Sequence, residues 1–291
     1  MICNLCPRKC NAERNDSIGK GYCKMPKSLY VSRVAHHYWE EPVISGKKGT
    51  VAVFFTGCTL DCIYCQNREI SHSNLGRKVT IDELAKEVTL LLDKGAESLS
   101  FITPSHYTNG IIQLLDIISP KVPVVYNTSG FDSIETLKKL EGYIDIYLPD
   151  FKYSNNDLGL EYSNVRNYFD VTSKAIEEMV RQTGEPIINQ DGIMEKGTMV
   201  RNLVLPSHTK NSIEVINYLA EKYGDKILFS LMGQYIPYGD AKYHKKLNRK
   251  ITKREYEKVL LAFESSGLNG YCQELSSASE KYIPEWDSDV L

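Results

Sequence analysis

The sequence predicts an α/β protein whose body is a partial (β/α)6 barrel, preceded by a small cysteine-rich extension held together by a metal. From residue 51 onward, short apolar runs alternate with amphipathic helical segments, which is typical of parallel strands joined by right-handed crossovers. Residues 1–45 are instead rich in Cys, Arg, Lys and Asn and show no strand or helix long enough to bury a core. We therefore expect three parts: the extension at 1–45, the barrel at 46–267 and a C-terminal tail at 268–291 that packs on the barrel.

Composition places the chain among ordinary globular proteins. Of its 291 residues, 42% are hydrophobic and 25% charged, and the net charge is -2. This charge argues against a surface that coats nucleic acid, although a local basic patch is compatible with it. No apolar run is long enough to span a bilayer, and the first residues lack the layout of a signal peptide. We expect a cytoplasmic protein without a membrane partner or an evident nucleic-acid partner.

Six strands and six helices make up the expected barrel. The strands are apolar runs rich in β-branched and aromatic residues at 51–55, 98–103, 122–126, 143–148, 199–205 and 227–231. Capping boxes predict that helices begin after Thr80 (with Glu83) and Thr252 (with Glu255), and Asp132 with Glu135 is read as a third start. Apolar periodicity predicts the other helices at 111–118, 165–181 and 213–221.

Three cysteines follow the first strand directly, at the spacing C-x3-C-x2-C. Cys58, Cys62 and Cys65 on one short loop can bind three irons of a [4Fe–4S] cluster and leave the fourth iron open to a small molecule. A structural zinc site normally takes four ligands, and a disulfide needs an oxidising compartment. The cluster is therefore the favoured interpretation, and the aromatic Tyr64 before the last cysteine agrees with it.

Four further cysteines stand in the extension. Cys3, Cys6, Cys10 and Cys23 supply four thiolates to a segment that has no core of its own and needs a staple to stay ordered. Four cysteines with a close first pair suit tetrahedral zinc, whereas an auxiliary iron–sulfur cluster would use the same loading machinery as the first. The sequence leaves zinc, a second cluster and incidental thiols open.

Polar residues recur where the expected strands end. In a parallel barrel the functional groups gather at the carboxyl ends of the strands, so these residues are candidates for a site that binds a zwitterionic, nucleotide-like cofactor and a polar substrate. They are Thr103, Ser105 and His106 after the second strand, Asn127 and Ser129 after the third, Asp150 and Lys152 after the fourth, Arg201 and His208 on and after the fifth, and Gln234 after the sixth. Asp150 with Lys152 could equally be an exposed ion pair, and the two histidines could be solvated.

The chain resembles the radical SAM superfamily, and within it the branch of pyruvate formate-lyase-activating-enzyme homologues. The likeness lies in the motif Cys-Asn-Leu-Cys-Pro-Arg-Lys-Cys at 3–10, the cluster loop, and the segments 125–130, 145–152, 200–206 and 231–235. It implies a radical SAM barrel in which S-adenosylmethionine (SAM) occupies the open iron. The reduced cluster then cleaves SAM to a 5′-deoxyadenosyl radical that abstracts a hydrogen atom.

The resemblance also implies roles for single residues. By analogy with glycyl radical enzyme activases, Asp150 and Lys152 are the catalytic candidates beside the SAM carboxylate and the substrate backbone, and Arg201 lies near the SAM carboxylate or ribose. Tyr64, Asn127 and Ser129 are further cofactor-binding candidates, with Asn127 standing where activases carry an aspartate. The chain departs from the family after the second strand, where Thr103 and Ser105 replace a Gly-Gly-Glu type sequence and are expected to accept hydrogen bonds from the SAM amino group.

The sequence leaves three functions open. The first is activation of a partner enzyme by generating a glycyl radical, with electrons from a donor such as flavodoxin or ferredoxin. The second is radical modification of another peptide or small molecule. The third is an iron–sulfur or zinc protein that does not cleave SAM, which the polar strand ends disfavour because an electron carrier needs no such cavity.

Overall fold

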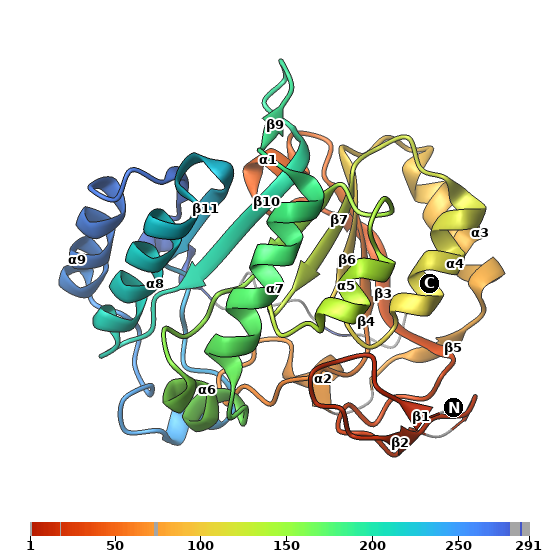
Figure 1. The fold of residues 1–291 in the computed structure, drawn as a ribbon, viewed down its shortest axis with the longest axis horizontal. Helices are drawn as coiled ribbons and strands as arrows, with labels where there is room; N and C mark the ends of the chain where they lie inside the picture. The colour runs from red at the N-terminus through yellow and green to blue at the C-terminus, as the bar shows by residue number, and fades with distance from the viewer. Residues whose placement is uncertain (1, 18, 73–74, 280–285, 287–291) are drawn as a thin grey trace.

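The computed structural model describes residues 2–17, 19–72, 75–279 and 286, and most of them surround one large sheet (Figure 1). Nine of its ten strands run in the order β12-β11-β10-β8-β7-β6-β4-β3-β5, and the tenth, β9, pairs with β10 outside this path. The neighbouring strands from β4 to β12 along this path pair in parallel. They are β4 (Thr50–Phe55), β6 (Ser98–Ile102), β7 (Val124–Thr128), β8 (Ile146–Pro149), β10 (Met194–Leu203), β11 (Leu228–Met232) and β12 (Asn269–Cys272). The sheet does not close on itself, so the predicted α/β partial barrel is confirmed.

Helices connect these strands as the periodicity predicts. They are α3 (Ile81–Leu92), α4 (Thr108–Ile118), α5 (Ile134–Lys139), α7 (Tyr168–Thr183), α8 (Thr209–Lys222) and α9 (Lys253–Glu264). Both complete capping boxes, at Thr80 and Thr252, are present. The expected start at Asp132 is wrong by one residue, because Ser133 accepts the hydrogen bond from the Thr136 amide. Asp132 is buried and instead accepts hydrogen bonds from the hydroxyls of Thr128 and Tyr126.

The expectation that residues 1–45 contain no long strand is wrong. β3 (Leu29–His37) is nine residues long and pairs antiparallel with both β4 and β5 (Arg77–Val79). Leu29, Val31 and Val34 are buried in it. A register shift between Val31 and Arg33 interrupts the apolar alternation, which is why the strand has no clean period of two. The antiparallel pair β1 (Ile2–Cys3) and β2 (Ala12–Glu13) lies before it.

Several other short elements were not predicted from the sequence. They are α1 (Pro42–Ser45), α2 (Arg68–His72), α6 (Asn156–Ser163) and β9 (Ile187–Ile188), with the 3₁₀ turns η1 (Gly224–Lys226), η2 (Gly239–Tyr243) and η3 (Leu275–Ser277). Part of the expected tail is the edge strand β12, and Trp286 packs edge-on against Phe54, with a ring separation of 5.2 Å. The remainder of that tail, residues 280–285 and 287–291, lies outside the described residues.

The two ends of the half-barrel differ, and this difference positions the site. At the amino ends of the strands, α1 places Val43 and Ile44 in an apolar cluster with inward-facing residues of β7, β8, β10 and β11. Figure 1 shows α1 at one end of the sheet, and α2, α6 and the β1–β2 segment at the other, toward which the arrow of β10 points. Apolar packing thus fills one end and leaves the carboxyl ends of the strands free to form a cleft.

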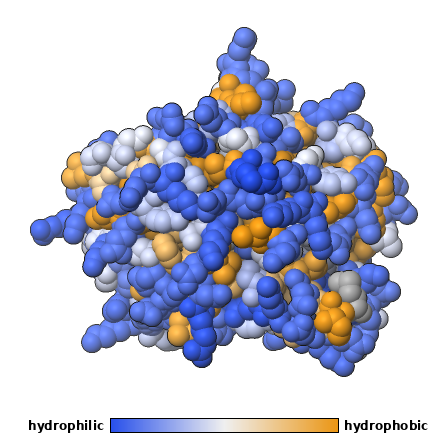
Figure 2. Space-filling view, in the orientation of Figure 1, coloured by the Kyte–Doolittle hydropathy of each residue, from blue (hydrophilic) through white to orange (hydrophobic). Residues whose placement is uncertain are grey.

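The surface agrees with this architecture. The face seen in Figure 2 is mostly hydrophilic, with apolar residues scattered over it rather than gathered in one large patch. Among the described residues, no helix combines the length and apolar character needed to cross a membrane.

Candidate active site

A cleft of about 420 Å³ opens at the carboxyl ends of the strands. It brings together most of the residues that the sequence analysis selected. Those that line it are Cys58, Cys62, Tyr64, Cys65, Thr103, Asn127, Ser129, Asp150, Lys152, Arg201 and Gln234. Three thiols, two cationic groups and several hydroxyl and amide groups therefore face one space.

The loop that carries the three thiols depends on a glycine at its start. Gly57 has a φ of 84°, and a Cβ on it would lie 2.4 Å from Cγ of Met25. Only glycine tolerates both this backbone conformation and the close approach of the N-terminal segment. The strand β4 therefore turns sharply at Gly57, and the cysteines that follow face the cleft.

Each of the three sulfurs lies near a hydrogen-bond donor. The Leu60 amide donates to Cys58 Sγ at 3.4 Å, Ser163 Oγ lies 2.9 Å from Cys62 Sγ, and Ser71 Oγ lies 3.7 Å from Cys65 Sγ. The Ser163 hydroxyl is also hydrogen-bonded to the Tyr153 hydroxyl at 2.7 Å. The Tyr153 hydroxyl in turn lies 2.7 Å from the Tyr64 hydroxyl. Such donors stabilise thiolates and tune the potential of a cluster that thiolates hold.

Burial raises the pKa of all three thiols, that of Cys62 to about 11, although the nearby Lys152 ammonium opposes the rise at Cys62. Thiolates here need a positive partner, which iron ions would supply. Among the described residues, no three His, Cys, Asp or Glu side chains are grouped so that they could hold one metal ion together. Cysteines of a cluster bind different irons and do not converge on one point, so a [4Fe–4S] cluster on this loop fits the donors present and stays a prediction.

Arg201 organises the charged floor of the cleft. Its Nε donates to Asp150 Oδ1 at 2.9 Å, Nη1 to Glu40 Oε1 at 3.0 Å and Nη2 to Asn127 Oδ1 at 2.8 Å. Asn127 in turn donates to Glu40 Oε2 at 2.6 Å. The guanidinium thus contacts three side chains of its own protein, which fixes its plane and its position.

Lys152 completes this network, because its Nζ lies 2.5 Å from Asp150 Oδ2. Burial alone would raise the pKa of Asp150, but the charges of Arg201 and Lys152 outweigh it and hold the pKa below its usual value. Burial would likewise lower the pKa of Lys152, and the carboxylate of Asp150 raises it instead. The two side chains are 16% and 15% exposed, so the pair is largely shielded from solvent and is not the exposed ion pair that the sequence left open.

Glu40 and Glu41 take part in this site and were missed by the sequence analysis. Both precede Pro42 at the start of α1, and α1 carries them toward the middle of the half-barrel. Glu40 holds Arg201 and Asn127, whereas Glu41 is 6% exposed and accepts hydrogen bonds from Ser230 Oγ at 3.0 Å. Burial raises the pKa of Glu41 to about 7, although Arg201 acts to lower it. The sequence signal was the adjacent acid pair itself, in a segment that showed no periodicity.

The residues after β6 are divided between the cleft and the core. Thr103 lines the cleft with a φ of 59°, which is costly for a β-branched residue and is typical of functional sites. Ser105 is buried beside Thr128, with 3.4 Å between the hydroxyls, and lies outside the set of described residues that line the cleft. His106 and His208 are buried, not solvated, and each is hydrogen-bonded, to Thr56 and Tyr162 respectively.

The cysteine-rich N-terminal segment packs directly against the cluster loop. Arg8 donates to the carbonyl oxygens of Thr59 and Asn164, each at 2.8 Å. The buried Arg14 lies 3.5 Å from Cys3 Sγ and donates to the His106 carbonyl at 2.8 Å. Two arginines thus connect the segment to the loops of the cleft.

The four cysteines of this segment influence one another. The pKa of Cys6 is raised to about 12, first by burial and to a smaller extent by Cys23, Cys10 and Cys3. Cys3 and Cys6 are buried, whereas Cys10 is exposed. In the part of the chain that the structure describes, no three of these thiols are grouped to hold one metal ion, and the metal they were predicted to bind stays a prediction.

The fold and the cleft define a class: a parallel half-barrel with a cysteine-bearing loop after its first parallel strand and a polar cleft at the carboxyl ends of the strands. Comparison with known proteins specifies it further. The family model described as the radical SAM superfamily matches residues 52–214. This is more than half of the chain, so the protein belongs to the radical SAM superfamily, which implies a [4Fe–4S] cluster and SAM as cofactors.

Individual relatives are distant. An uncharacterized protein of Methanocaldococcus jannaschii is 28% identical over an alignment of 276 residues, and the match covers 92% of this chain and 75% of that protein. SuiB of Streptococcus suis, solved with its precursor peptide SuiA, is 16% identical with a TM-score of 0.53; the match covers 77% of this chain and 48% of SuiB. A radical SAM methyltransferase from Sphaerobacter thermophilus is 12% identical with a TM-score of 0.52, covering 79% of this chain and 69% of that chain. At these identities the two solved structures show a shared fold and nothing more.

Proposed function

We propose that this radical SAM enzyme holds its [4Fe–4S] cluster on Cys58, Cys62 and Cys65, binds SAM in the cleft, and abstracts a hydrogen atom from a peptide or protein substrate. The observation that carries the proposal is the convergence of the three thiols with Asp150, Lys152 and Arg201 around one space. When bound and reduced, the cluster would supply the electron for reductive cleavage of SAM to methionine and a 5′-deoxyadenosyl radical able to take a hydrogen atom from the substrate.

The residues of the chain have separate tasks in this proposal. Lys152 presents an ammonium group on the cleft wall, held by Asp150, and attracts the carboxylate of SAM or the carbonyl groups of a substrate backbone. Arg201 keeps Asp150 and Asn127 in place and adds positive charge to the floor. Thr103 and Ser129 offer polar groups to the cofactor from the ends of β6 and β7.

A glycine of a partner enzyme is the first candidate substrate, because the chain resembles glycyl radical enzyme activases in its Asp150-x-Lys152 and Arg201 positions. Modification of another peptide is the second candidate, favoured by the similar fold of SuiB, which was solved with a precursor peptide. A glycine-radical signal in electron paramagnetic resonance, on a candidate partner incubated with the enzyme, SAM and a reductant, distinguishes the first from the second.

The test of the core proposal is reductive cleavage of SAM. Anaerobically reconstituted protein with a chemical reductant should release 5′-deoxyadenosine and methionine. Cys62→Ala should abolish this release and the response of the cluster spectrum to SAM, because three thiolates leave no spare ligand. Cys272→Ala is the matched control, since Cys272 is exposed on β12 and does not line the cleft. Normal cleavage by Cys62→Ala would refute the assignment of the cluster.

A further inference from the structure

A basic loop lies beside the cluster loop, and no function described so far uses it. It comprises residues 239–254, which follow β11 and lead into α9. Seven of the thirteen residues from 242 to 254 are Lys or Arg, and none of them is acidic. In a protein with a net charge of -2, this is a local concentration of positive charge.

Most of this charge is exposed. Lys242, Lys245 and Lys246 are exposed, and among the described residues none of the three forms an ion pair. Arg249 is neutralised by Glu255 at 2.7 Å, and Lys253 lies 3.6 Å from Glu257. Tyr243 is 88% exposed between the lysines. Asp240 at the start of the loop pairs with Arg68 at 2.8 Å. The three lysines between 242 and 246 thus present positive charge that no ion pair of the described residues compensates, with one exposed aromatic side chain among them.

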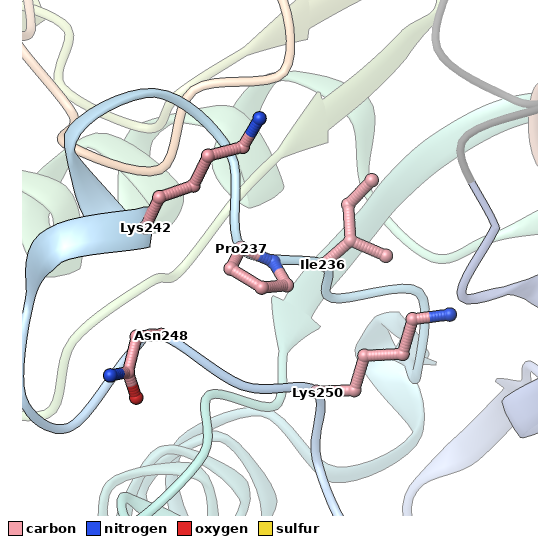
Figure 3. A pocket seen from close by; sticks show the side chains of 5 residues that line it. All are labelled: Ile236, Pro237, Lys242, Asn248 and Lys250. Atoms are coloured by element: carbon pink, nitrogen blue, oxygen red, sulfur yellow. The ribbon is translucent and has the colours of Figure 1, made fainter.

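The basic loop also forms a hollow. A pocket of about 360 Å³ is lined by Ile236, Pro237, Lys242, Asn248 and Lys250. Figure 3 shows Lys242 and Lys250 reaching from two segments on either side of Ile236 and Pro237. The lining holds two ammonium groups and no carboxylate, so it is suited to receive carboxylates from another molecule.

The basic loop contacts the backbone between two cluster cysteines. The Ala241 amide donates to the Ile63 carbonyl at 2.9 Å, and a Cβ on Gly239 would lie 3.1 Å from that same oxygen. Tyr235, just before the hollow, lines the cleft and packs edge-on against Tyr64, with 6.0 Å between the rings. A molecule docked on the basic loop therefore sits on the outer side of the loop that carries Cys62 and Cys65.

The hollow and the cleft share none of their lining residues. A substrate has to enter the cleft to meet the radical, whereas an electron only has to reach the cluster over a short distance. A docking surface that avoids the cleft and contacts the cluster loop thus suits electron delivery better than substrate binding. Nucleic acid is disfavoured because the protein has a net charge of -2 and this basic segment is short, with seven of the 35 Lys and Arg residues.

We propose that residues 239–254 are the docking surface for the electron donor, a small acidic one-electron carrier protein. This rests on the proposed function, since it requires a cluster on Cys58, Cys62 and Cys65. The reduced donor gives up one electron, the oxidised cluster takes it up, and no bond forms or breaks. Electrostatic attraction between the acidic donor and the basic loop speeds the encounter, and salt weakens it.

The test is a rate measurement on the reconstituted protein. A triple variant, Lys242→Glu with Lys245→Glu and Lys246→Glu, is compared with a control triple variant, Lys86→Glu with Lys94→Glu and Lys121→Glu. The control lysines are exposed on the α3–α4 side, and both variants change the net charge equally. Stopped-flow absorbance follows cluster reduction by reduced flavodoxin and, separately, by photoreduced 5-deazariboflavin, which is uncharged and needs no docking site.

We expect at least a roughly tenfold slower reduction by flavodoxin in the loop variant at low salt, with the control near wild type. Reduction by 5-deazariboflavin should be equal in all three proteins, which shows that the cluster is intact. If the loop variant is slow with both reductants, the glutamine version of the same three substitutions is measured. The proposal stands only if that version is slowed with flavodoxin alone.

Equal flavodoxin rates in the loop and control variants overturn the proposal, as does a loop variant that loses binding to RNA while it keeps its flavodoxin rate. These results are separable from failure of the proposed function. That failure would appear as wild-type protein whose cluster is reduced by 5-deazariboflavin but does not cleave SAM.

Discussion

Arg201 has three donors committed to Asp150, Glu40 and Asn127, and this geometry predicts the effect of replacing it. Arg201→Lys keeps the charge but offers a single nitrogen, so two of the three partners lose a charged hydrogen bond. We expect the free energy of unfolding to fall by about 1.5–3 kcal/mol for each charged hydrogen bond lost, and the affinity for SAM to fall with it. Denaturant titration measures the first, and titration of the magnetic resonance signal of the reduced cluster measures the second.

Arg254→Lys is the control, because Arg254 is exposed and forms no ion pair within the described part of the chain. Unchanged SAM affinity in Arg201→Lys, together with reduced stability, would mean that Arg201 holds the floor of the cleft and does not contact the cofactor.

Glu41 predicts a pH dependence of stability. Its pKa is raised from 4.5 to about 7, first by burial, so the folded protein keeps a proton that the unfolded chain releases. Between pH 4.5 and about 7 the folded protein binds more protons than the unfolded chain, so the free energy of unfolding falls as the pH rises. At pH 7 the free energy of unfolding is lower by at most about 3 kcal/mol than it is well below pH 4.5.

Glu41→Gln removes this titration. Urea denaturation at pH 5, 6 and 7 should show that the stability of the wild type, relative to the variant, decreases with each step. A stability difference that stays constant over this range would contradict the shifted pKa.

The N-terminal segment and β3 should respond differently to metal removal, although the sequence analysis grouped them. The described residues between 2 and 28 hold the two-residue pair β1–β2 and an isolated bridge from Arg14 to Gly19, so bound metal would supply much of their folding energy. β3 pairs with β4 on one side and β5 on the other and does not depend on the metal. Chelation should therefore speed amide hydrogen exchange within residues 2–28 and leave residues 29–37 protected.

Elemental analysis of the anaerobic protein decides between zinc and additional iron. Cys6→Ser should reproduce the fast exchange without chelator, because Cys6 interacts with all three other thiols. Four free thiols without metal, and exchange that chelator does not change, would refute the site.

Elements with a regular period or a complete cap were predictable from the sequence, and irregular ones were not. The helix starts at Thr80 and Thr252 were predictable because each capping box involves only residues within four positions of one another in the sequence. β3 was missed because its bulge breaks the alternation, and α6 because its eight residues show little amphipathicity. Ser163 at the end of α6, beside Cys62, was missed along with its helix.

At the scale of the whole molecule, the order of parallel strands was enough to predict which residues meet. Cys58, Asn127, Asp150 and Arg201 all lie near the carboxyl ends of neighbouring strands and line one cleft. Glu40 could not be found in this way, because it reaches Arg201 from a segment 161 residues away in the sequence. The packing of Arg8 on the cluster loop is equally non-local and leaves no periodic signal.

The contacts of that N-terminal segment set an order of events during synthesis. Arg8 binds the carbonyl of Asn164, 156 residues later, and the hydroxyls of Ser133 and Thr136 donate to the carbonyl of Leu5. At 5–20 residues per second, a ribosome needs roughly 10–30 s to make the chain between Arg8 and its partner. During that interval the four thiols of the N-terminal segment are not yet packed against the cluster loop and the residues around Asn164. The segment can therefore close over the cluster loop only after the chain through Asn164 has been made.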